Sequence, residues 1–202
     1  MTKIIGITGG IGSGKTTACD YLKSNNFAVH ESDKAVAKMY SKPNKSFLNF
    51  LKKIFSKDVV ANNKINKQKI ADIIFNNTKT KKTFEDYIHK QVKKSRDSFI
   101  KKNIKNKKGA VFIDIPLLFE SKLEKNFDVV LCVIAKKKIR TERVLRNKKF
   151  TKKTLQKIFK SQVSDKERKA RSNIIIYNND TKKDFIFSLE KALIKLLKWE
   201  KL

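Results

Sequence analysis

The chain has 202 residues, 40% hydrophobic and 34% charged, which allows one domain with a real core and excludes both two ordinary domains and a disordered chain. The formal charge of +30, from 49 Lys and Arg against 19 Asp and Glu, invites a nucleic-acid interpretation. The lysines are spread through every segment among Asn and Ile, however, which favours an AT-rich coding bias over a functional basic surface and predicts no specific nucleic-acid partner.

The N-terminal residues predict a strand, a loop and a helix in succession. Residues 4–8 form a short apolar run, residues 9–14 are rich in glycine, and residues 16–24 carry apolar side chains at helical spacing. A second short strand is expected at residues 27–29. Asp33 then lies at the carboxyl end of that strand, and a further helix follows it.

The middle of the chain, residues 46–106, is expected to be mostly helical, because apolar residues recur at helical spacing and glycine and proline are almost absent. A helical excursion of this size between strands suggests a substrate-binding insertion. Residues 110–115 and 128–134 are continuous apolar runs, typical of parallel strands buried on both faces, and residues 174–177 make a fifth strand. The predicted fold class is α/β, with a five-stranded parallel sheet that binds ligands at the carboxyl ends of its strands.

Helical segments surround the last strand. Residues 136–149 are basic and helical, and residues 152–171 continue as a polar helical pair, so this segment is placed to close over bound phosphates. The chain continues into an amphipathic helix over residues 185–197. We expect the apolar residues of that helix, Phe187 among them, to pack in the core rather than to form a partner site.

The two cysteines and the apolar runs indicate the compartment. Cys19 and Cys132 lack metal-like spacing and are too few for a disulfide framework, which favours a reducing cytoplasm. No signal-peptide pattern follows Met1, and the longest apolar run, residues 129–135, is far short of the roughly 18 residues of a membrane span. We expect a cytoplasmic protein without a membrane segment, as a monomer or a weak homo-oligomer.

The strongest motif is GGIGSGKT at residues 9–16, a full match to GxxxxGK[ST] between a predicted strand and a predicted helix. Glycines let backbone N–H groups turn inward around a β-phosphate, and the N-terminus of the following helix points at the same anion. Lys15 would reach the β- and γ-phosphates, and the Thr16 hydroxyl would bind magnesium. The motif therefore predicts ATP and Mg²⁺. The residues expected to bind the nucleotide here are Gly10, Gly12, Ser13, Gly14, Lys15, Thr16 and Thr17.

Two acidic positions are candidates for the chemistry. Asp114 ends an apolar run, where an acidic residue can support the magnesium ion directly or through water, although a cap or turn role is the alternative. Asp33 and Glu31 both follow the second strand, and the sequence does not choose which of them faces the acceptor hydroxyl. The alternative for Asp33 is an N-cap of a helix that starts at Lys34.

Three arginines recur at three-residue intervals on one helical face: Arg140, Arg143 and Arg146. This spacing presents guanidinium groups together to a polyphosphate. A solvated basic face is the alternative.

In order and wording, these motifs resemble the dephospho-coenzyme A kinase family from residue 4 to about residue 180. TGGIGSGKTT at residues 8–17 resembles the phosphate loop of that family, and IPLLFES at residues 115–121 resembles its next signature, which other P-loop kinases lack. The further matching residues are Asp33, His89, Arg143, Arg146, Gln162 and Asn178. The departures from the family pattern are Glu31, Ser56, Lys90, Arg140, Ser172 and Asn173.

The resemblance implies a P-loop kinase fold in three parts. These are a core at about residues 1–40, 108–135 and 172–202, a helical coenzyme-binding part at about residues 41–107, and a lid at about residues 136–171. It implies ATP-dependent phosphorylation of the ribose 3′-hydroxyl of dephospho-coenzyme A, the last step of coenzyme A biosynthesis.

The resemblance also implies roles for individual residues. Asp33 would be the base toward the 3′-hydroxyl, and Lys15 and Arg143 would join it as catalytic residues. Arg146 would bind the phosphates with Arg143, Asn178 would belong to the nucleotide site, and Thr16 and Asp114 would hold the metal. Together with the phosphate-loop residues, these residues make up the expected site.

Two other functions compete with this interpretation. One is another small-molecule P-loop kinase, such as a nucleoside or shikimate kinase, and IPLLFES argues against it. The other is a nucleic-acid-associated ATPase that uses the basic surface. The chain has no room for a separate nucleic-acid domain and no aromatic stacking signature, so we rank the nucleic-acid-associated ATPase last.

Overall fold

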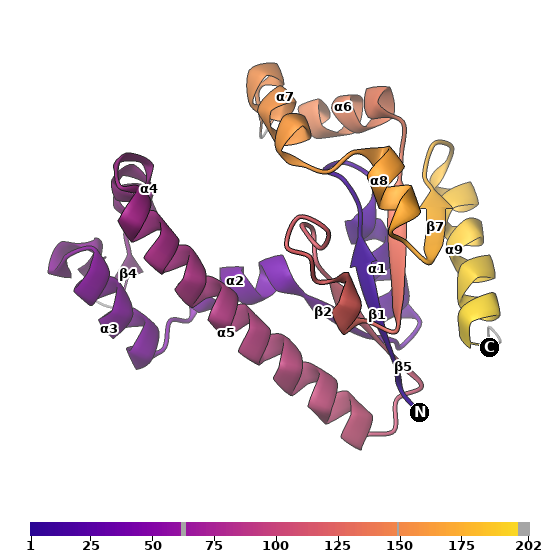
Figure 1. Ribbon diagram of the computed structural model, residues 1–202, viewed down its shortest axis with the longest axis horizontal. Coiled ribbons are helices and arrows are strands. Elements are labelled where there is room, and N and C mark those ends of the chain that lie inside the picture. The colour runs from indigo at the N-terminus through magenta and orange to yellow at the C-terminus, as the bar shows by residue number, and fades with distance from the viewer. Residues whose placement is uncertain (62–63, 149, 198–202) are drawn as a thin grey trace. The chain divides into compact units, whose positions relative to one another are not determined.

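Figure 1 shows the computed structural model, which describes residues 1–61, 64–148 and 150–197. The chain divides into two compact units. The first comprises Met1–Glu31 and the chain from Ile100 onward, and the second is Ser32–Phe99. Each unit is described by itself below.

The first unit is built on a parallel sheet of five strands in the order β2-β5-β1-β6-β7. The strands are β1 (Lys3–Thr8), β2 (Ala28–Glu31), β5 (Ala110–Asp114), β6 (Val129–Ile134) and β7 (Ile174–Tyr177). All five residues of β5 are buried, as a parallel strand covered on both faces requires. The predicted α/β fold class with a five-stranded parallel sheet is confirmed.

Helices cover one face of this sheet. The helices on this face are α1 (Lys15–Ser24) and α9 (Lys182–Leu197). The first unit also contains the end of α5 (Thr78–Lys105) from Ile100, η2 (Glu124–Asn126), α6 (Lys137–Arg146), α7 (Lys152–Ser161) and α8 (Asp165–Ala170). Side chains of α1 and α9 share one core cluster with alternate residues of β1, β5 and β6. In Figure 1, α9 lies beside β7, with which it is in contact.

The segment after β5 covers the other face of the sheet. Leu118 and Phe119 of this segment are buried. Gly6 of β1 leaves room for Leu118, because a Cβ added to Gly6 would lie only 2.9 Å from Leu118 Cδ1. The IPLLFES segment is therefore packed closely against the first strand through Leu118.

The second unit is mostly helical, as predicted. It contains α2 (Ser32–Ser41), α3 (Lys45–Ile54), α4 (Lys67–Asn76) and the part of α5 (Thr78–Lys105) up to Phe99. Asn44 and Asn66 cap α3 and α4, because their side-chain oxygens accept hydrogen bonds from Phe47 N (2.8 Å) and Lys69 N (3.0 Å). The buried core residues of this unit are Phe47, Leu51, Val59, Val60, Ile70 and Phe84.

Two details differ from the sequence prediction. A short antiparallel pair, β3 (Val60–Ala61) with β4 (Lys64–Ile65), follows the 3₁₀ helix η1 (Lys57–Val59) inside the region expected to be helical. Phe187 of α9 is 56% exposed rather than in the core, so that prediction is wrong. The buried stripe of α9 is Phe185, Leu189 and Leu193, and a residue two positions after Phe185 points to the opposite side of the helix.

Among the residues described, no helix combines the length and the apolar character that a membrane span needs.

Candidate nucleotide-binding site

The glycine loop between β1 and α1 turns back on itself before the helix begins. Ser13 N donates a hydrogen bond to Gly10 O at 3.1 Å, which closes the turn. Gly14, the residue before α1, has φ 108°, a left-handed conformation that favours glycine. A Cβ added there would lie 2.1 Å from Asn178 Nδ2, so both the backbone and the neighbouring side chain require glycine at this position.

This loop is shaped to hold an anion. The first N–H groups of α1 have no partner within the helix and point toward the loop, where the partial positive charge of the helix end also acts. Lys15 folds back over the loop, and its Nζ donates a hydrogen bond to Gly9 O at 3.0 Å. Ser13 Oγ is buried and has no hydrogen-bond partner among the described residues. The concave turn, its backbone donors and one ammonium group together fit a polyphosphate.

Asn178 and Arg143 hold the end of the loop next to α1. Asn178 follows β7, is 6% exposed, and donates from Nδ2 to Ser13 O at 2.8 Å. Arg143 of α6 donates to Asn178 O at 3.1 Å and to Asn178 Oδ1 at 3.2 Å. This chain of hydrogen bonds connects β7 and α6 to the loop and brings the predicted residue Arg143 to it.

A cavity of about 380 Å³ opens between the loop and α6. Its lining residues are Ile11, Gly12, Ser13, Gly14, Lys15, Thr16, Thr17, Arg143, Val144, Asn147 and Phe150. Most residues predicted to bind the nucleotide therefore line one cavity. Arg146 does not line it and is exposed on α6, and Gly10 lies outside the lining, where it faces Arg140.

Asp114 ends β5 next to β1, pairing in register with Ile7, and it is only 9% exposed. The charge of Asp114 acts on the thiol of Cys19 in α1. Burial is the main cause that raises the pKa of Cys19, and the charges of Asp114 and Glu31 act in the same direction. Cys19 follows Thr16 by three residues on α1, so the two lie on the same helix face. Asp114 and Glu31 therefore lie near enough to α1 for their charges to act on Cys19.

The two acidic residues after β2 have different environments. Glu31 ends β2 and forms an ion pair with Lys23 of α1. Asp33 is exposed in the first turn of α2, which begins at Ser32. The carboxylate of Asp33 accepts no hydrogen bond from any residue that the structure describes. The alternative in which Asp33 caps a helix starting at Lys34 is therefore not the arrangement found.

Sequence reasoning missed a buried ion-pair network behind the loop. Glu120, in the IPLLFES segment, accepts hydrogen bonds from Val163 N at 2.9 Å and from Arg168 Nη2 at 3.3 Å. Asp165 pairs with both Arg168 (3.2 Å) and Arg140 (3.1 Å). Arg168 is only 2% exposed, and a buried charge of this kind is tolerated only when it is paired.

The network changes the interpretation of the three arginines of α6. Arg140 is 6% exposed and is bound by Asp165, so it does not share one phosphate-facing surface with Arg143 and the exposed Arg146. Burial lowers the pKa of Arg140, and the charge of Asp165 acts in the opposite direction. The only local sequence signal for this ion-pair network was the i, i+3 spacing of Asp165 and Arg168.

The comparisons with known proteins agree with this geometry. A family model described as dephospho-CoA kinase matches residues 3–184. The dephospho-CoA kinase of Bartonella henselae is 35% identical over 192 residues, 95% of each chain. That of Fusobacterium nucleatum is 33% identical and covers 93% of this chain and 95% of its own.

Solved structures share the fold. TT1252 from Thermus thermophilus, 27% identical, superposes with a TM-score of 0.78 over 96% of this chain and 98% of its own. The dephospho-CoA kinase from Campylobacter jejuni, 23% identical, gives a TM-score of 0.74 over 98% of each chain. A shikimate kinase from Bacteroides thetaiotaomicron reaches only 0.52 at 10% identity, with 98% of this chain and 100% of its own covered. On the family match and the identity to its relatives, the chain belongs to the dephospho-CoA kinase family.

Proposed function

We propose that this protein is a dephospho-CoA kinase, which transfers the γ-phosphoryl group of ATP to the ribose 3′-hydroxyl of dephospho-coenzyme A and so completes coenzyme A. The observation that carries the proposal is the phosphate loop of residues 9–16, held by Asn178 and Arg143, in a chain of this family. IPLLFES, whose Glu120 anchors the segment next to the loop, supports the same assignment.

The loop residues would bind the phosphates of ATP. Backbone N–H groups of Gly12 to Thr16 would surround the β-phosphate, because the loop and the N-terminus of α1 direct them inward. Lys15 would exchange its hydrogen bond to Gly9 O for the β- and γ-phosphate oxygens, where its charge stabilises the group in transfer. Arg143, placed on the same cavity, would add a second positive charge.

Thr16 and Asp114 would hold Mg²⁺, Thr16 by its hydroxyl and Asp114 directly or through water. The place of Asp114 supports this, because it ends β5 in register with Ile7 of β1, the strand that leads into the phosphate loop. When bound, Mg²⁺ would neutralise negative charge that develops on the phosphate oxygens. Metal-free protein is expected to bind ATP with lower affinity than protein with Mg²⁺, and Asp114→Asn should reduce that difference.

The second unit would bind the acceptor, and Asp33 would orient and deprotonate its 3′-hydroxyl. An exposed carboxylate with no hydrogen bond from the described protein is free to accept one from a substrate hydroxyl. We assign the helical coenzyme-binding part to about residues 41–107, the lid to about residues 136–171, and the core to the remainder. His89, a further residue that matches the family pattern, lies on α5 in this unit.

The protein would act in the cytoplasm as a monomer or a weak homo-oligomer. Both cysteines are buried and unpaired, and burial raises the pKa of both thiols, which suits a reducing compartment. Sedimentation at several concentrations would measure the state of association.

One assay tests the function against its rivals. ATP consumption is measured with dephospho-coenzyme A, adenosine, shikimate and duplex DNA offered in turn. We expect turnover with dephospho-coenzyme A alone. Turnover that requires shikimate or adenosine would assign another small-molecule kinase, and stimulation by DNA would assign the nucleic-acid-associated ATPase.

A further inference from the structure

Gln162, the residue that follows α7, contacts the phosphate loop without belonging to its motif. Its side-chain Oε1 accepts a hydrogen bond from Ile11 N at 3.1 Å. We propose that Gln162 donates a hydrogen bond from its side-chain Nε2 to the γ-phosphate of ATP, and so positions the group that is transferred. This inference rests on the proposed function, since it assumes that the loop binds ATP.

The hydrogen bond to Ile11 fixes the orientation of the Gln162 amide. A backbone N–H can only donate, so it must meet the oxygen of the side chain and not the nitrogen. The Nε2 group is then on the other side of the amide plane, with two N–H donors. It donates to no residue that the structure describes, although the side chain is only partly exposed. Gln162 therefore presents an oriented donor beside the phosphate loop.

The γ-phosphate is expected at the end of the loop formed by residues 9–11, which Gln162 contacts. Lys15, which reaches the β- and γ-phosphates in P-loop enzymes, places its Nζ at Gly9 O, two residues before Ile11. Asn178 holds the opposite end of the loop, at Ser13. The ammonium of Lys15 and the amide of Gln162 are therefore both bonded to the first residues of the loop, where the terminal phosphate is expected.

The backbone on both sides of Gln162 is held in place. Gln162 N donates to Ile158 O at 3.2 Å, which ends α7, and Val163 N donates to Glu120 Oε1 at 2.9 Å. Glu120 is itself bound by the buried Arg168. A side chain anchored in this way loses little further conformational freedom when it binds a ligand, as a positioning residue requires.

Two arginines near the same end of the loop are less suitable donors. A Cβ added to Gly10 would lie 2.1 Å from Arg140 Nη1 and 3.4 Å from Arg168 Nη1, so both guanidinium groups lie against the loop. Both are buried, and both are ion-paired with Asp165. Their charges are thus compensated within the protein, and they support the loop while Gln162 retains an available donor.

The same orientation suits a kinase better than a hydrolase. In P-loop enzymes that hydrolyse nucleotides, a glutamine orients the attacking water. Here the Oε1 atom of Gln162 is already bound by Ile11 N–H and has reduced capacity to accept a hydrogen bond from water. The Nε2 group remains available to donate to the phosphate, so the orientation suits a contact to the phosphate better than one to an attacking water.

Two substitutions test this role. Gln162→Glu keeps an acceptor for Ile11 N–H, removes the donor and adds a negative charge that repels the γ-phosphate, whereas Gln162→Met keeps the volume without either group and without a charge. The matched control is Gln156→Leu, an exposed position on α7, the helix that precedes Gln162, with no hydrogen bond to a described residue. Affinities for ADP and for an ATP analogue with a non-transferable γ-phosphate are measured by calorimetry, and turnover is measured with ATP and dephospho-coenzyme A.

We expect both Gln162 variants to bind the ATP analogue about 10-fold to 100-fold more weakly, the effect of one hydrogen bond to a charged group, and ADP within about 2-fold of wild type. Gln156→Leu should change neither affinity. Equal losses for the two nucleotides, or no loss for either, would overturn the proposal. If Gln162→Glu does not fold, Gln162→Met decides. If wild-type protein binds both nucleotides but does not phosphorylate dephospho-coenzyme A, the proposed function fails while the nucleotide comparison still tests Gln162.

Discussion

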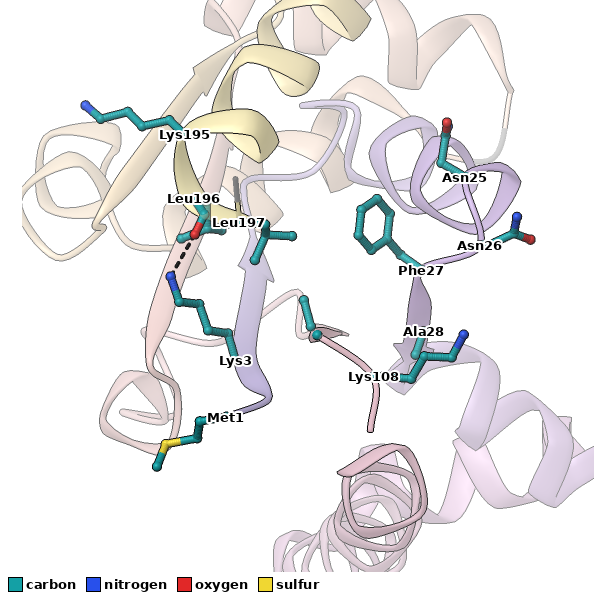
Figure 2. Close-up of a pocket in the computed structure, with 12 residues that line it drawn as sticks. Met1, Lys3, Asn25, Asn26, Phe27, Ala28, Lys108, Lys195, Leu196 and Leu197 are labelled. Atoms are coloured by element: carbon teal, nitrogen blue, oxygen red, sulfur yellow. Dashed lines mark hydrogen bonds between the residues drawn. The ribbon is translucent and has the colours of Figure 1, made fainter. Parts of the chain in front are cut away.

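Two cavities of the first unit lie at opposite ends of strand β1. The one at the carboxyl end, about 380 Å³, is lined by the phosphate loop and α6. The one at the amino end is larger, about 740 Å³, and is lined by residues that include Lys3, Phe27, Lys108 and Lys195 (Figure 2). The larger cavity, with three lysines, has none of the motif residues. Cavity size and positive side chains alone would therefore have identified the wrong end of the sheet.

Helix α1 explains the difference, since each cavity is next to one of its ends. Its N-terminus, at Gly14 and Lys15, contributes N–H groups and a partial positive charge to the smaller cavity. Asn25 and Asn26, just past its C-terminus, line the larger one, where the helix end contributes a partial negative charge and no converging N–H groups. Backbone N–H groups that converge on one point thus distinguish a phosphate-binding site from a cavity that is merely lined by lysines.

The largest expected effect comes from Asp33, which follows the carboxyl end of β2. Asp33→Asn keeps the shape of the side chain but cannot accept the proton of the acceptor hydroxyl. We expect turnover to fall by about 10²-fold to 10⁴-fold, the range typical of a general base, with ATP affinity close to wild type. Steady-state kinetics together with ATP titration measure both quantities. An active Asp33→Asn protein would transfer the proposed role to Glu31.

Lys15→Ala tests the smaller cavity directly. Removing the ammonium takes away charge stabilisation of the transferring phosphate, so turnover should fall by about 10²-fold to 10³-fold. The melting temperature should stay within a few degrees, because Lys15 is partly exposed on the loop. A variant that retains more than a tenth of wild-type turnover would contradict the assignment of this cavity.

Substitutions of Arg143 and Arg146 compare a residue that lines the smaller cavity with one that does not. Arg143→Ala removes two hydrogen bonds to Asn178 and a charge from the lining, and should lower turnover about 10-fold to 100-fold. Arg146→Ala, on the exposed face of α6, should change turnover less than about 3-fold by comparison. Equal effects of the two substitutions would show that both arginines bind phosphate only after the predicted lid, about residues 136–171, closes over it.

Lys3→Ala should have the smallest effect, because it alters only the larger cavity. Lys3 Nζ donates to Leu196 O at 2.7 Å in an exposed position, so its loss should cost about 1 kcal/mol of stability or less. Turnover should remain within about 2-fold of wild type. Thermal unfolding and the same coupled assay measure the two quantities. A large loss of turnover would show that the amino end of the sheet contributes to function.

The sequence predicted the features that depend on local pattern. Continuous apolar runs such as residues 110–115 are sufficient to identify buried parallel strands, and the glycine motif is sufficient to place the phosphate loop. Periodicity also placed the C-terminal helix, but not which side of it is covered. Phe187 is exposed because the sheet accepts the stripe through Phe185 and no described element covers the other side.

Features that depend on distant contacts could not be predicted. Arg140 is bound by Asp165, which lies in another helix, and nothing in the spacing of the α6 arginines indicates that one of them is buried. The contact of Gln162 with Ile11 joins residues far apart in the chain. Such pairs arise when elements pack, so a single sequence carries no local pattern for them.

The neighbouring strands β2 and β5 have an evolutionary consequence. The chain leaves the sheet after β2 and returns to it at β5, and these two strands are direct neighbours, with Ala28 paired with Val111. The whole second unit is therefore the crossover between two adjacent parallel strands. A lineage can lengthen, shorten or exchange that crossover without changing any strand register of the sheet. The length and sequence of the second unit can thus change while the phosphate loop keeps its place at the end of β1.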